Sequence, residues 1–179
     1  LFPSGSTPYG IAISPDGTIA VIANSGSNTV SILDIDHMQI LGSAIPVGSN
    51  PNQVAITPDG KTALVTNNGS GTVSLVDLTS MIVTHTISGS GLSNPFGIAV
   101  TPDGTKALVG NTNSNALAII DLSSLTVTAT IALQDGSSGI AISPDGTLAL
   151  VIDPFSSLVT AINLENLSII GSPIQVGFR

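Results

Sequence analysis

The sequence predicts an all-β fold built from four similar sheets, because one turn motif recurs four times at a nearly constant spacing. The motif is Ser or Thr followed by Pro-Asp-Gly, and its aspartates are Asp16, Asp59, Asp103 and Asp145, which stand 43, 44 and 42 residues apart. Runs rich in Val, Ile, Leu and Ala separate the turns, as expected for strands. A period of about 40–45 residues is typical of one four-stranded blade of a β-propeller. We therefore expect a β-propeller of four four-stranded antiparallel blades.

The Pro-Asp-Gly turn has a physical explanation at each position. Pro fixes φ for the second position of a type I turn, Asp accepts hydrogen bonds within the bend, and Gly takes the left-handed conformation that ends the loop. The motif therefore predicts a hairpin between the first and second strands of each blade. It also predicts positive φ at its glycines, for example Gly60 and Gly104.

In the second repeat, the pattern predicts strands over residues 53–57, 62–67, 72–78 and 82–87. The first two are nearly continuously apolar, which is typical of strands packed between neighbouring blades. The fourth mixes polar and apolar residues, as an outer edge strand does. The same pattern places blades at approximately 8–48, 51–91, 95–133 and 137–177 within a single domain of residues 1–179.

Other positions recur at fixed offsets from the turn aspartate. Four residues after it stands an alanine, and because blades taper toward the central axis we expect Ala63 and Ala107 to be buried. Eighteen residues after it stands a short oxygen-bearing side chain, which we expect to cap the next turn. These capping residues are Asp34, Asp77, Asp121 and Asn163.

The two ends of the chain resemble the last strand of a blade. Residues 1–6 align with 44–49, the tail of the first repeat's last strand, and residues 171–177 align with 42–48. The chain is thus expected to open on a strand tail and to close on a full last strand. Three arrangements of the blades are consistent with this pattern: a four-bladed ring, half of an eight-bladed ring completed by a second copy, or a fragment of a larger propeller.

Charge and composition exclude several function classes. The formal net charge is −8, and Lys61, Lys106 and Arg179 are the three fixed cations, so nucleic acid is not an expected partner. No apolar run approaches the roughly 18 residues of a membrane span, so membrane insertion is not expected. The sequence contains no Cys, which rules out disulfides and thiolate chemistry.

The candidate ligand-binding surface is a set of variable loops that should share one face of the blades, opposite the uniform Pro-Asp-Gly turns. We call this surface the loop face, and it comprises residues 24–28, 48–52, 67–71, 89–94, 111–115, 134–138 and 153–157. Variable loops on a fixed scaffold are common binding sites. The candidate residues are Asn24, Asn28, Asn52, Asn67, Asn68, Asn94, Asn111, Asn113, Asp135 and Asp153.

Two further interpretations of the loop face stay open. The asparagines also suit turns because Asn tolerates a left-handed backbone. Tyr9, Phe96 and Phe155 lie beside the same loops, where they could stack on a ligand or pack between blades.

Catalytic and cofactor signatures are not found, and His37 and His85 fall far apart in the repeats. We therefore expect no bound metal, haem or quinone.

One segment of the second repeat resembles a known family. Leu64-Val65-Thr66-Asn67, together with the Pro-Asp-Gly turn before it and Val76-Asp77-Leu78 after it, looks like the YVTN-type β-propeller repeat. The resemblance covers essentially the whole chain, with a looser motif at residues 21–24, 108–111 and 150–153. It implies a secreted, periplasmic or cell-surface protein, often a surface-layer or adhesive component. Related lactonases and haem or quinone oxidoreductases depend on His, Arg and Glu clusters that this sequence lacks.

These observations favour a non-enzymatic binding or scaffold module that presents the loop face to a protein or glycan partner. The alternative is a lactonase-like or quinoprotein-like enzyme with a pocket at the central channel. A third interpretation is a purely structural section of a longer propeller array. A homodimer that closes the ring is a further expectation.

Overall fold

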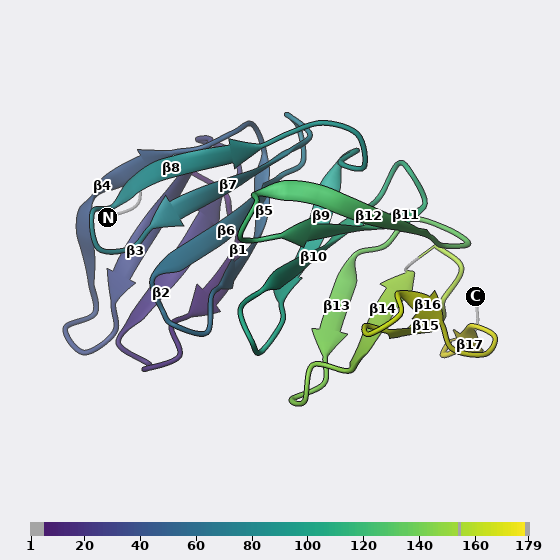
Figure 1. Ribbon diagram of the computed structural model, residues 1–179. Helices are drawn as coiled ribbons and strands as arrows, with labels where there is room; N and C mark the ends of the chain where they lie inside the picture. Colours follow the sequence, from purple (N-terminus) through teal and green to yellow (C-terminus); the bar gives the residue numbers. More distant parts are fainter. Residues whose placement is uncertain (1–5, 154, 178–179) are drawn as a thin grey trace. The chain divides into compact units, whose positions relative to one another are not determined.

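A computed structural model describes residues 6–153 and 155–177, and within this part of the chain the regular structure is β-strand (Figure 1). Each sequence repeat forms one antiparallel sheet, and the strands of a sheet follow one another in chain order. The predicted four antiparallel blades are therefore confirmed. The strand tail expected at residues 1–6 lies almost entirely outside the described residues. Among the described residues, no helix has the length and apolar character needed to cross a membrane.

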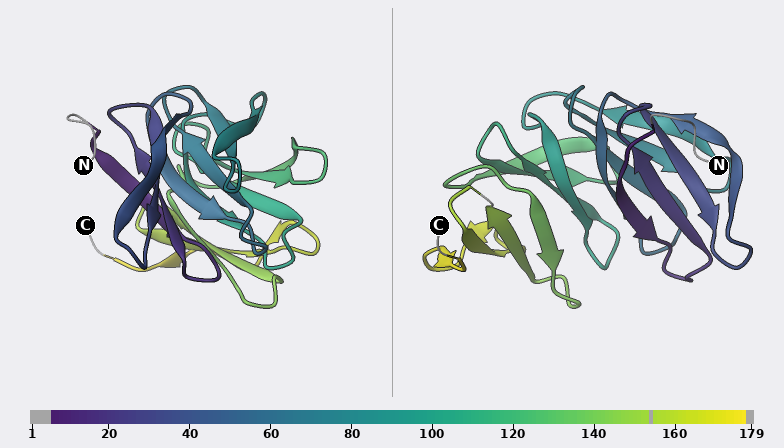
Figure 2. Two further views of the ribbon diagram at one scale, coloured as in Figure 1. Left: turned by 90° about the vertical axis from the view of Figure 1, so that its left-hand side faces the viewer. Right: turned by 180° about the vertical axis from the view of Figure 1, so that it is seen from behind.

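The chain divides into two compact units, Leu1–Ser88 and Gly89–Arg179, and each unit contains two blades. The strands of the first unit are β1 (Pro8–Ile13), β2 (Ile19–Asn24), β3 (Thr29–Asp34), β4 (Gln39–Pro46), β5 (Pro51–Ile56), β6 (Thr62–Asn67), β7 (Thr72–Asp77) and β8 (Ile82–Ile87). Those of the second unit are β9 (Pro95–Val100), β10 (Lys106–Asn111), β11 (Ala116–Asp121), β12 (Thr126–Ala132), β13 (Gly139–Ile142), β14 (Leu148–Asp153), β15 (Leu158–Asn163), β16 (Ser168–Ile169) and β17 (Ile174–Gln175). Both views in Figure 2 show the meander of the first blade, coloured purple to blue.

The strands of the second blade agree closely with their predicted ranges. The ranges 62–67 and 82–87 are confirmed without change, whereas the first strand begins two residues earlier and ends one residue earlier than predicted. The third strand ends at Asp77, one residue early, because the Asp77 carboxylate already accepts hydrogen bonds from the following turn.

The last blade departs from the expectation of a full fourth strand. Two short strands, β16 and β17, take its place, and both pair with β15. Gly171 between them has φ of 65°, and Pro173 has no amide hydrogen to donate to a ladder. The first blade tolerates the equivalent glycine, Gly42, as a bulge within an unbroken β4.

The four Pro-Asp-Gly turns have the geometry that their residues predict. Their glycines have φ between 71° and 76°, which confirms the left-handed conformation. In the second blade, the Thr57 hydroxyl donates to Asp59 Oδ1 at 2.6 Å, and the Lys61 amide donates to the same oxygen at 3.1 Å. The Gly60 amide closes the turn on the Thr57 carbonyl at 2.8 Å.

Each unit has an apolar core between its two blades. In the first unit, Val21, Val30 and Ile32 of the first blade pack with Val54 and Val65 of the second. In the second unit, Leu108 and Leu117 of one blade likewise share a cluster with Val151 and Ile162 of the other. Ala63 and Ala107 are fully buried, as expected from their recurrence in the repeats.

The first strands of the two blades approach closely within each unit, and a glycine permits the approach. A Cβ atom on Gly10 of β1 would lie 2.1 Å from the Asn52 carbonyl oxygen in β5. A Cβ on Gly97 of β9 would lie 2.1 Å from the Ser138 carbonyl oxygen, just before β13. The same contact between blades is therefore made in both units.

Candidate functional site

The loop face of the first unit is held together by hydrogen bonds between neighbouring loops. The Asn50 amide donates to Asn28 Oδ1 at 2.9 Å, which joins the β4–β5 loop to the β2–β3 loop. The Ser49 amide donates to the Ser70 hydroxyl at 3.1 Å, and the Asn68 amide donates to the Asn50 carbonyl at 3.0 Å. The first of these bonds holds the exposed Asn28 side chain in position.

The second unit has a comparable connection between its loops. Asn113 Nδ2 donates to Asn94 Oδ1 at 2.8 Å, and the Thr112 amide donates to the Asn94 carbonyl at 3.2 Å. Asn113 is exposed, whereas Asn94 is half-buried. An amide side chain is thus presented at the surface with its orientation fixed by a second amide.

Some of the asparagines in the loops occupy backbone positions with a left-handed conformation. Asn28, Asn50, Asn94 and Asn115 have φ between 47° and 57°, a left-handed conformation that Asn tolerates better than most residues. The alternative interpretation of these asparagines as turn residues is therefore confirmed at these positions. It does not exclude binding, because Asn28, Asn50 and Asn115 are also exposed.

Five of the ten candidate residues are buried and do not present their side chains at the surface. They are Asn24, Asn52, Asn67, Asn111 and Asp153. Asn24 Nδ2 donates to the Ser31 hydroxyl at 2.9 Å, and Asn67 Nδ2 donates to Ser74 in the same way at 2.9 Å. These side chains tie the end of the second strand of a blade to its third strand.

The remaining candidates lie at or near the surface. Asn28 and Asn113 are exposed, and Asn68, Asn94 and Asp135 are half-buried. The structure adds Asn50 and Asn115, which sequence reasoning placed in the loops without singling them out. Their position at the last residue of a loop could have identified them. Of the aromatic residues beside the loops, Tyr9 and Phe155 are exposed and Phe96 is half-buried.

Most of the acidic side chains are occupied in turns. The Thr101 hydroxyl and the Thr105 amide hold the pKa of Asp103 down to about 2, and Ser123 and Ser124 do the same for Asp121. Hydrogen bonds from neighbouring hydroxyls and amides also lower the pKa of Asp16, Asp34, Asp59, Asp77 and Asp145. The Asp153 carboxylate accepts from the Phe155 and Ser156 amides. The predicted role of the third-strand aspartates as turn caps is confirmed.

The lowered pKa values predict a loss of stability in acid. A carboxylate with a folded-state pKa of about 2 and an unfolded value near 4 stabilises the fold fully above pH 4, and this contribution is lost as the pH falls through 2. We expect the urea midpoint of unfolding to fall between pH 5 and pH 2, and Asp103→Asn to make this fall shallower. A midpoint that stays constant from pH 6 to pH 2 would contradict the prediction.

Metal-binding side chains do not gather in the described part of the chain. No group of three or more His, Cys, Asp or Glu residues lies close enough there to hold a metal ion. His37 Nδ1 contacts Asp34 Oδ2 at 3.0 Å in the β3–β4 turn, and His85 lies in β8.

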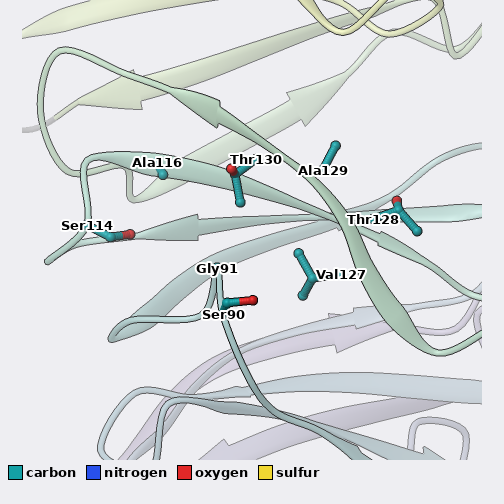
Figure 3. Close-up of a pocket in the computed structure, with 8 residues that line it drawn as sticks. All are labelled: Ser90, Gly91, Ser114, Ala116, Val127, Thr128, Ala129 and Thr130. Carbon is teal, nitrogen blue, oxygen red and sulfur yellow. The ribbon is translucent and has the colours of Figure 1, made fainter.

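A shallow hollow of about 420 Å³ lies beside the outer strand β12. Figure 3 shows its lining, in which the hydroxyl groups of Ser90, Ser114, Thr128 and Thr130 surround Gly91 and Val127. Gly91 lies close to β12, since a Cβ there would be 3.0 Å from methyl groups of Thr130 and Val127. Sequence reasoning missed this hollow because it treated the mixed outer strands only as solvent-facing edges.

Comparison with known proteins gives the fold and little more. No protein-family model and no curated protein matches the sequence. Hydrazine synthase from Kuenenia stuttgartiensis is similar in structure, with a TM-score of 0.87, 27% identity and 98% of this chain covered. A functionally unknown protein from Desulfotomaculum acetoxidans gives a TM-score of 0.81 at 21% identity over 92% of this chain. The chain spans about half of each, 51% and 55% of their lengths. The sheet order and these similarities identify a β-propeller fold.

Proposed function

We propose that this chain binds a neutral, hydroxyl-rich ligand such as a glycan at its loop face, as a binding or scaffold module outside the cytoplasm. The observation that carries the proposal is the fixed orientation of exposed amide side chains. Asn28 is held by the Asn50 amide, and Asn113 is held by Asn94. A primary amide both donates and accepts hydrogen bonds, which matches the hydroxyl groups of a sugar.

The charge distribution supports a neutral ligand. Lys61 and Lys106 lie beside the Pro-Asp-Gly turns, at the opposite ends of the strands from the loop face. With a net charge of −8, the chain repels polyanions and offers their phosphates or sulfates little compensation. Orientation by preformed hydrogen bonds also reduces the entropy that binding would cost.

The location outside the cytoplasm and a role in a surface layer depend on the resemblance to the YVTN-type repeat. The alternative function is an enzyme with a pocket at the central channel. The similarity to half of a hydrazine synthase chain is the observation that favours this alternative. Eight acidic side chains accept hydrogen bonds from neighbouring residues in turns. Because these side chains are engaged in the fold, this observation favours the binding module.

A panel of immobilised neutral polysaccharides tests the proposal. We expect Asn113→Ala and Asn28→Gly each to weaken binding about tenfold, the effect of one lost hydrogen bond. Glycine is chosen at position 28 because φ is 57° there. Asn166→Ala is the matched control, because Asn166 is exposed in the turn between β15 and β16, on the side of the Pro-Asp-Gly turns. Binding that is absent throughout the panel, or equally strong in all variants, would overturn the proposal.

A further inference from the structure

Apolar side chains are exposed on the first blade and on the last blade. In β1, Ile11 is 60% exposed and Ile13 is 62% exposed, and we call this surface the β1 face. In β14, Leu150 is 41% exposed and Ile152 is 47% exposed, and we call this surface the β14 face. Large aliphatic side chains grouped in this way on strands mark an interaction surface.

Where a blade has a neighbour in the same unit, the equivalent positions pack against that neighbour. Val54 in β5 corresponds to Ile11, and it is only 7% exposed because the first blade packs on it. Leu108 in β10 and Val21 in β2 correspond to Leu150, and both are fully buried against the blade that follows them. The β1 face and the β14 face are therefore the two complementary halves of the contact that joins the blades within each unit.

Glycine at position 139 gives independent support. Gly10 and Gly97 occupy the same repeat position, and each lies against a carbonyl oxygen in, or directly before, the next blade's first strand. For Gly139, the nearest atoms to an added Cβ are instead side-chain atoms of Ile152, at 3.1 to 3.6 Å. Gly139, Ala141, Leu150 and Ile152 line a hollow of about 350 Å³. The last blade thus has the small residues and the open groove that receive the next blade's first strand within each of the two units.

We propose that the β14 face of one copy of this chain binds the β1 face of a second copy, head to tail. By the pattern of Gly97 and Ser138, the Tyr9 carbonyl of the second copy lies against Gly139. Two copies related by a two-fold axis make this contact twice and leave neither face exposed. This proposal is independent of ligand binding at the loop face.

Light scattering on the purified chain tests the proposal. We expect a mass of two chains that does not change on dilution. Ile13→Glu and Leu150→Glu should each give monomers, because each removes one half of both contacts. Met38→Glu is the matched control, since Met38 is 73% exposed in the β3–β4 turn and should stay dimeric. A parent chain that is monomeric in solution would overturn the proposal. This includes a monomer in which the β1 face and the β14 face of the same chain meet in a four-bladed ring.

Two further measurements separate this contact from others. Gly139→Ala should also give monomers with an unchanged circular dichroism spectrum, because the added methyl meets only a flexible side chain within the chain but a carbonyl oxygen in the dimer. An equimolar mixture of Ile13→Glu and Leu150→Glu should recover dimers, since one intact contact of the head-to-tail type is then available. If only one of Ile13→Glu and Leu150→Glu disrupted the dimer, the two copies would meet through the same face of each chain. That result would overturn the proposal.

Discussion

Gly97→Ala is expected to destabilise the second unit by about 3 kcal/mol or more, the upper part of the range for overpacked sites. The added Cβ would lie 2.1 Å from the Ser138 carbonyl oxygen and 2.9 Å from its carbon. Both are backbone atoms beside β13, so the clash cannot be relieved by rotating a side chain. The two blades of the unit would have to separate, which would open the core between Leu108 and Val151. The urea midpoint of unfolding measures the effect.

Gly17→Ala is the matched control for this substitution. Gly17 has φ of 76°, and no heavy atom lies within 4 Å of an added Cβ, so the cost is backbone strain of about 1 kcal/mol. Gly10→Ala should resemble Gly97→Ala, because its Cβ would lie 2.1 Å from the Asn52 carbonyl oxygen. If Gly17→Ala and Gly97→Ala lowered the midpoint equally, the close approach between the blades would be contradicted.

Features set by neighbouring residues could be predicted from the sequence. The Pro-Asp-Gly turn is stabilised by atoms within five residues of its aspartate, so its glycine conformation and its capping bonds followed from the motif alone. The strand ranges 62–67 and 82–87 were equally predictable, since turn residues bound both. The broken last strand was harder to predict, because Pro173 replaces a residue that is Ala44 in the first repeat.

The division of the asparagines into buried and exposed was not predictable from residue type. Asn24 and Asn28 lie four residues apart, yet one ends a buried strand and the other occupies a left-handed loop position. A signal was nevertheless present in the sequence. Asn24 is followed by Thr29 and Ser31 at the same intervals at which Thr72 and Ser74 follow Asn67, and these hydroxyls accept from the asparagines in the structure. A polar set that recurs in register indicates a structural network.

The blade-joining faces were predictable in kind but not in detail. Strands apolar on both sides indicated that each blade is covered by its neighbours. The sequence could not show that Gly10 and Gly97 make the close approach, because this depends on the distance between two strands about 40 residues apart in the chain. Only the three-dimensional contact shows why Gly139 is the informative position on the last blade.

Asn111→Ala is the second substitution with a large expected effect, and we expect it to destabilise the chain by about 2–4 kcal/mol. The fully buried Asn111 side chain accepts from the Ser93 amide at 2.9 Å. Its Nδ2 donates to the carbonyl oxygens of Gly91 at 2.9 Å and Ala116 at 3.1 Å. Alanine would remove these three hydrogen bonds, and each buried group left unsatisfied costs about 1–3 kcal/mol. It would also release the segment before β9 that lines the hollow beside β12.

Asn67→Ala provides the comparison, because Asn67 occupies the same repeat position with different partners. Its Nδ2 donates to the hydroxyls of Thr72 and Ser74, which can rotate toward other acceptors. Its Oδ1 is buried without a hydrogen-bond partner among the described residues, so removing that oxygen relieves a cost already present in the native state. We therefore expect Asn67→Ala to cost about 1 kcal/mol, clearly less than Asn111→Ala. Urea titration of both variants measures the difference, and a larger loss for Asn67→Ala would show that the backbone contacts of Asn111 do not dominate its contribution.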